Sequence, residues 1–144
     1  AHFWWLYDRL DRPIPYPEKA ITGIIEVQRD TGLWGARIFN GAIPQGIDFD
    51  AVNGLRLALK AVSEDHRNAV KADIVATLDR YACVVDHHLA RDGSMAELYP
   101  KIHKIVGTLN TIAEVNILYR QLTGRDRFIL DRPWRSALTE VSWQ

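Results

Sequence analysis

The sequence contains a single cysteine, no excess of charge of either sign and no long apolar run. Cys83 lies in the apolar stretch YACVV, where a small buried side chain is expected, and a lone cysteine favours a cytoplasmic setting. The 18 basic residues balance the 18 acidic ones, so the strongest general reason to expect nucleic acid or an anionic membrane as partner is missing. No apolar run approaches the roughly 20 residues that a helix needs to span a bilayer.

Motifs of catalysis and metal binding are scarce as well. The chain has no Gly-x-Ser-x-Gly nucleophile motif and no glycine-rich phosphate loop. Its histidines lack the His-x-x-x-His or Glu-x-x-His spacing that lets one helix hold an ion with two side chains. The adjacent His87 and His88 would point about 100° apart on a helix. We therefore expect neither a metal nor a cofactor.

The composition is that of an ordinary globular protein. With 144 residues, 47% of them hydrophobic and 25% charged, the chain fits a single domain that spans residues 1–144. It begins AHFWWLYDRL, without Met, which leaves two alternatives open: residues have been removed, or the chain is a fragment of a longer polypeptide.

Apolar residues recur every three or four positions along most of the chain. After the long loop over residues 31–46, the apolar positions between 47 and 62 step by four, four, three and four residues. Sustained alternation and hairpin turns, which would indicate strands, are nearly absent. The sequence therefore predicts an all-α protein, with helices over residues 2–10, 18–29, 47–62, 70–89 and 102–123, and a one-turn segment at 95–99.

Two stretches of the chain resemble each other. Arg-Asp occurs at residues 29–30 and 91–92, and Val-Asn at residues 52–53 and 115–116, so that the copies lie 62 or 63 residues apart. Each copy reads as a helix, an Arg-Asp pair with a nearby glycine, a loop and a second helix. Two such units predict helical hairpins packed as an array, although short polar motifs also recur by chance.

The stretch VQRDTGLWG, followed by IDFDAV, is similar to the repeats of α/α-toroid proteins such as the prenyltransferase and squalene-cyclase group. The residues that match the turn of such a repeat are Gln28, Gly32, Trp34 and Gly35. The resemblance implies that residues 18–122 form part of an α/α toroid, in which acidic residues at the start of the next helix line a central cavity. Such repeats serve enzymes and binding proteins alike, so the resemblance does not choose between them.

Asp48 and Asp50 are the candidate catalytic residues. The resemblance places them where class II terpene cyclases carry an Asp-x-Asp-Asp motif whose third residue protonates an alkene, but Ala51 occupies the fourth position. A carboxyl group acts as such an acid only where burial and a neighbouring carboxylate keep it protonated. The alternative is helix capping, with Asp48 as the N-cap and Asp50 in the first turn, where both would oppose the positive helix end.

Polar residues of the two loops form a candidate ligand-binding rim, which suits a small, neutral, hydroxylated ligand. Trp34 lies in a glycine-flanked turn, so it either anchors the loop or lines a cleft. The predicted ligand-binding residues are Trp34, Arg37, Asn40, Gln45, Glu97, Tyr99 and His103.

The N-terminal aromatic cluster is expected in the core or at an interface, including that of a homo-oligomer. Its members are His2, Trp4, Trp5 and Tyr7. Together these features favour a binding or interaction module for a small polar ligand or a protein partner, with no nucleic acid and no membrane. The alternative is a carbohydrate- or isoprenoid-active enzyme of α/α-toroid type that uses one of the two aspartates as acid.

Overall fold

The computed structural model describes residues 4–35, 46–89 and 102–129, and most of these residues are helical. No strand occurs in these three ranges, and the predicted all-α fold class is confirmed. The helices are α1 (Trp4–Arg9), α2 (Pro17–Glu26), α3 (Gly46–Lys60), α4 (Glu64–Leu89) and α6 (Ile102–Thr123).

Helix α4 begins earlier than the apolar periodicity predicts. The gap that the prediction leaves between residues 62 and 70 is confined to residues 61–63, because Ser63 caps the new helix. Its Oγ accepts a hydrogen bond from the backbone N–H of His66 at 3.2 Å, and its carbonyl accepts one from the N–H of Arg67 at 3.0 Å. The one-turn segment predicted at residues 95–99 lies outside the described residues.

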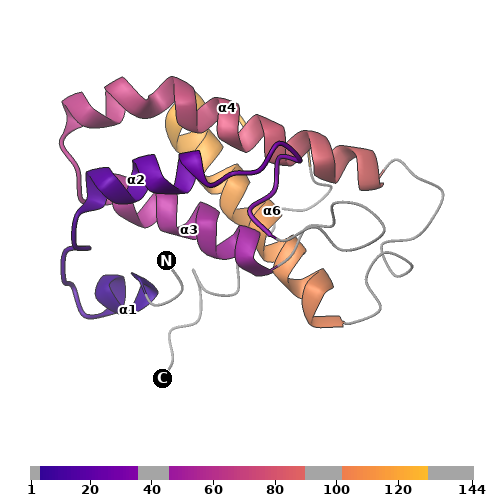
Figure 1. Ribbon diagram of the computed structural model, residues 1–144, viewed down its shortest axis with the longest axis horizontal. Coiled ribbons are helices and arrows are strands. Elements are labelled where there is room, and N and C mark those ends of the chain that lie inside the picture. The colour runs from indigo at the N-terminus through magenta and orange to yellow at the C-terminus, as the bar shows by residue number, and fades with distance from the viewer. Residues whose placement is uncertain (1–3, 36–45, 90–101, 130–144) are drawn as a thin grey trace.

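The helices pair into two hairpins, α2–α3 and α4–α6 (Figure 1). Helices α2 and α4 run in one direction, and α3 and α6 return in the other. The most extensive contact between helices is that of α3 with α6, and α3 also packs against α2 and α1. The predicted packing of helical hairpins is therefore observed, whereas the prediction that these hairpins form part of an α/α toroid stays a prediction.

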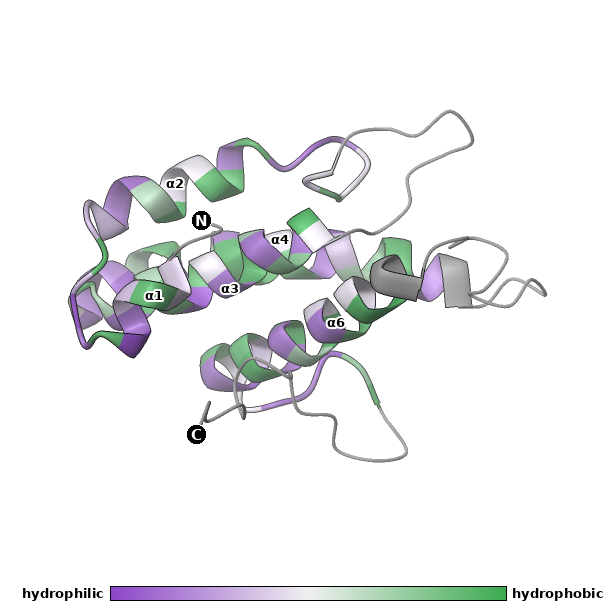
Figure 2. Cartoon of the chain, turned by 90° about the horizontal axis from the view of Figure 1, so that it is seen from below, coloured by the Kyte–Doolittle hydropathy of each residue, from purple (hydrophilic) through white to green (hydrophobic). Residues whose placement is uncertain are grey.

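Helix α3 lies at the centre of this array and is buried on nearly every side. From Asp48 to Leu59 every residue is buried except Asp50, which is half-buried. The sequence predicted a single buried stripe, but α1, α2 and α6 cover several faces of the helix at once. Val52 on α3 and Val115 on α6, which correspond in the two sequence copies, are both fully buried. Figure 2 shows polar and apolar residues interspersed along the helices around this core.

One expectation about the core needs correction. Cys83 is exposed, because it lies about 200° around α4 from the buried Tyr81, on the side away from the other helices. In the N-terminal aromatic cluster, Trp4 is partly buried against the core, whereas Trp5 and Tyr7 are exposed, so that a role of these two at an interface stays a prediction. His2 lies outside the described residues.

Candidate functional site

The turn that follows α2 is held against α4. Gly32 has a φ of +81°, in the left-handed region, and a Cβ at this position would lie 2.6 Å from the carbonyl oxygen of Arg80. The side-chain amide of Gln28 donates to the carbonyls of Gly32 and Thr77, both at 2.9 Å. Its oxygen accepts a hydrogen bond from Arg80 Nε at 2.7 Å. Gln28 thus links the turn of the first hairpin to the first helix of the second.

Trp34 anchors the same turn in the core. Its Nε1 donates to the carbonyl of Ile24 at 2.7 Å. That carbonyl lies at the end of α2, where the backbone N–H of Gln28 bonds to Ile25 instead, at 3.2 Å. The indole ring is buried and lies tilted against Tyr81, with ring centroids 6.2 Å apart. Trp34 therefore serves as a loop anchor, and a contact with a ligand stays a prediction.

Asp48 ties this turn to α3. Its side chain is fully buried, and its Oδ1 accepts hydrogen bonds from the backbone N–H groups of Trp34 at 2.8 Å and Gly35 at 3.3 Å. Because α3 begins at Gly46, Asp48 is the third residue of the helix, and the prediction that it is the N-cap is wrong. Asp50 follows about 200° around the helix and is half-buried, so the two carboxylates do not converge.

The other predicted ligand-binding residues fall where the structure gives no side chains. His103 belongs to the first turn of α6, of which only the backbone is described. The residues that lie outside the described ranges are Arg37, Asn40, Gln45, Glu97 and Tyr99. The polar loop rim therefore stays a prediction.

A buried ion pair joins α3 to α6. Arg56 Nε donates to Glu114 Oε2 at 2.6 Å, and the two side chains are 10% and 0% exposed. The other carboxylate oxygen, Oε1, is buried and has no hydrogen-bond partner in the described part of the chain. Sequence reasoning missed this pair because its members lie 58 residues apart. The available signal was a single charged residue inside each of two apolar stretches, LRLAL and IAEVNIL.

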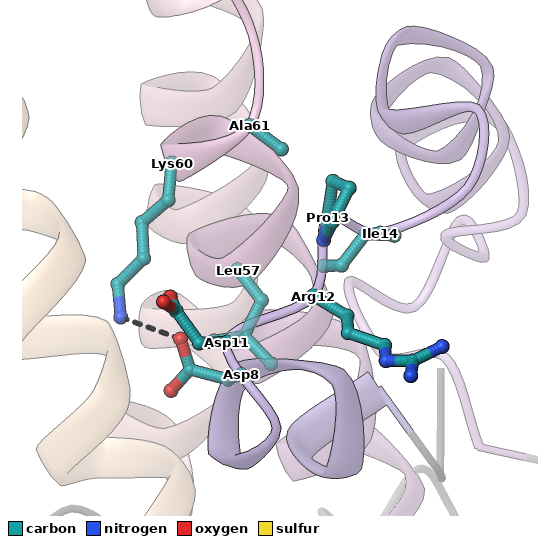
Figure 3. A pocket seen from close by; sticks show the side chains of 8 residues that line it. All are labelled: Asp8, Asp11, Arg12, Pro13, Ile14, Leu57, Lys60 and Ala61. Atoms are coloured by element: carbon teal, nitrogen blue, oxygen red, sulfur yellow. Dashed lines mark hydrogen bonds and ion pairs between the residues drawn. The ribbon is translucent and has the colours of Figure 1, made fainter.

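A pocket of about 330 Å³ opens between α1, the turn that follows it and the C-terminal end of α3 (Figure 3). Its volume lies at the lower end of the range of small-molecule sites. One side of the rim carries an ion pair in which Lys60 Nζ donates to Asp8 Oδ1 at 3.0 Å. The lining residues are Asp8, Asp11, Arg12, Pro13, Ile14, Leu57, Lys60 and Ala61.

Of the predicted site residues whose side chains the structure describes, which are Trp34, Asp48 and Asp50, none lines this pocket. The segment DRPIPYP, at residues 11–17, was interpreted only as a helix break because its prolines cannot continue a helix. The charged residues that precede those prolines were the available signal. Their approach to α3 depends on tertiary packing, which the sequence does not display.

The described ranges also bear on metal binding and on membranes. No group of three or more His, Cys, Asp or Glu residues is placed there to hold a metal ion. None of the helices in these ranges combines the length and the apolar composition that crossing a membrane requires. No protein-family model, no curated protein and no solved structure matches the chain, so the resemblance to α/α-toroid repeats stays a prediction.

Proposed function

We propose that the chain is a binding module and that the pocket between α1 and α3 holds a small ligand. The observation that carries the proposal is the meeting of charged and apolar side chains at one concave surface. Small-molecule sites combine apolar walls with a few polar groups that fix the orientation of the ligand. Here the floor includes Leu57 and Ile14, and the charged groups are Asp8, Asp11, Arg12 and Lys60.

The alternative function, a carbohydrate- or isoprenoid-active enzyme, has less support. A general acid has to reach the substrate atom that it protonates. The carboxylate of Asp48 is buried and accepts hydrogen bonds from two backbone N–H groups, and Asp50 does not line the pocket. Neither candidate acid therefore belongs to the pocket that the described part of the chain forms.

Occlusion of the pocket tests the binding proposal. Backbone amide chemical shifts would be followed by NMR while the protein is titrated with a panel of small amines, carboxylates and polyols. We expect shifts around Asp11 and Leu57 that disappear in Ala61→Trp, because the indole would fill the pocket. The matched control is Ala72→Trp. Ala72, like Ala61, is an exposed alanine, but it lies on α4 away from the pocket. Binding that survives in Ala61→Trp, or no binding by any compound, would contradict the proposal.

A separate substitution tests the enzyme alternative. If Asp50 is a catalytic acid, Asp50→Asn should abolish turnover of an isoprenoid or oligosaccharide substrate without lowering the melting temperature. The structure places Asp50 fifth in α3, past the first turn. If Asp50 only contributes charge near the N-terminal end of the helix, the same substitution lowers stability by no more than about 0.5 kcal/mol and leaves ligand binding unchanged. A loss of stability alone counts against the enzyme.

A further inference from the structure

The pocket described above carries opposite charges at its two ends, and this arrangement indicates the class of ligand. Figure 3 shows the Asp11 carboxylate beside Asp8 and Lys60 on one side, whereas Arg12 extends on the other side. Asp8 and Lys60 neutralise each other through their ion pair at 3.0 Å. The charge left over is therefore one carboxylate at one end and one guanidinium at the other.

Asp11 is held in place by the way in which α1 ends. Its φ of +49° lies in the left-handed region, and its N–H bonds to the carbonyl of Asp8 at 3.3 Å while the N–H of Arg12 bonds to that of Tyr7 at 2.8 Å. This pair of bonds is a Schellman motif, in which glycine usually occupies the left-handed position. A side chain there adds backbone strain that glycine would avoid. The turn thus fixes the backbone of Asp11 beside the pocket, although the turn itself does not require a side chain at this position.

The charges of Asp11 and Arg12 are not paired with other described residues of the protein. Within the described residues their side chains make no hydrogen bond and no ion pair. Leu57 and Ala61 line the pocket together with them and offer an apolar surface. An ammonium group would complement the carboxylate, a carboxylate would complement the guanidinium, and methylene groups would complement the apolar wall.

We propose that the pocket binds a small zwitterion, in which an ammonium group at Asp11 and a carboxylate at Arg12 are separated by an apolar spacer. This inference rests on the proposed function, because it names the ligand class of the same pocket. A polyol would leave both charges unmatched, and a ligand with one charge would leave the other end unpaired.

Three probes of nearly equal length test the charge pattern: 6-aminohexanoate, hexylamine and hexanoate. Affinities would be measured by NMR titration and isothermal calorimetry at low ionic strength. We expect 6-aminohexanoate to bind at least about tenfold more tightly than either singly charged probe, since each end adds a charge-assisted hydrogen bond. A series from 4-aminobutanoate to 8-aminooctanoate would then find the best separation of the two charges.

Two variants test which residue binds each charged end of the ligand. Asp11→Asn keeps a residue that tolerates the left-handed conformation, and it should lower the affinity for 6-aminohexanoate to that for hexanoate. Arg12→Gln should lower it to that for hexylamine. The matched controls, Asp73→Asn and Arg67→Gln, make the same charge changes at exposed positions of α4 and should leave binding unchanged.

The outcomes separate this inference from the proposal on which it rests. If 6-aminohexanoate and a singly charged probe bind equally tightly, the proposal of a zwitterionic ligand is wrong. If Ala61→Trp abolishes this binding, the proposal that the pocket is a ligand site is still supported. Binding of polyols without any response to the three probes also overturns the zwitterion alone. If no compound of the panel binds, both proposals are wrong.

Discussion

Gly32 offers the sharpest test of how the two hairpins are joined. In Gly32→Ala, the left-handed backbone conformation costs about 1–2 kcal/mol for a residue with a side chain. The new Cβ would also lie 2.6 Å from the carbonyl oxygen of Arg80, a backbone atom of α4 that cannot rotate away. Relieving such an overlap in a packed region costs about 1–3 kcal/mol more. We therefore expect the free energy of unfolding to fall by about 3 kcal/mol.

Two other glycines separate the two contributions. Gly124 has a φ of +76°, but a Cβ added there would meet no atom within 4 Å, so Gly124→Ala should cost about 1–2 kcal/mol from backbone strain alone. Gly23 lies inside α2 with open space around it, so Gly23→Ala should stabilise the protein by about 0.5–1 kcal/mol. Urea denaturation followed by circular dichroism would measure all three. If Gly32→Ala costs no more than Gly124→Ala, the close approach to α4 does not limit stability and the reasoning is refuted.

Contacts elsewhere give three further expected outcomes. Removing either member of the Arg56–Glu114 pair should cost about 3–5 kcal/mol in urea denaturation, whereas Arg56→Met combined with Glu114→Leu should cost less than either single change. Asp48→Ala should cost about 3 kcal/mol by the same assay, because it removes the acceptor of two buried backbone N–H groups. The Arg120 guanidinium hydrogen-bonds to Asp126 and lowers the pKa of that carboxyl group. The stabilisation that this pair provides is therefore present above the ordinary pKa of an aspartate and is lost as the pH falls through the lowered one. An NMR titration should show a low midpoint for Asp126 that rises in Arg120→Gln.

The parts of the structure that depend on local pattern could be predicted from the sequence. The existence of α3 and α4 and the position of α6 follow from apolar spacing, which reports one face of a helix directly, whereas the early start of α4 and the burial of the other faces of α3 do not. The end of α2 at Glu26, short of the predicted residue 29, is less visible in the pattern. It follows from the bonds that Gln28 makes to the turn and to α4, and these exist only in the folded chain.

The candidate sites were harder to predict because they combine distant residues. The partners Arg56 and Glu114 meet only when α3 and α6 pack in one register. Cys83 was expected inside because its neighbours in the sequence are apolar, but helical geometry turns it outward. The pocket needs the turn after α1 to pack against the far end of α3, and no local motif encodes that approach.

The bonds of Gln28 also bear on the order in which the chain assembles. The amide of this residue reaches Thr77 and Arg80, so the turn of the first hairpin is complete only after the first helix of the second hairpin is in place. A fragment that ends before α4 would keep α2 and α3 but lose the surface against which their connecting turn closes. We therefore expect that the first hairpin does not fold by itself and that the two hairpins unfold in one cooperative transition.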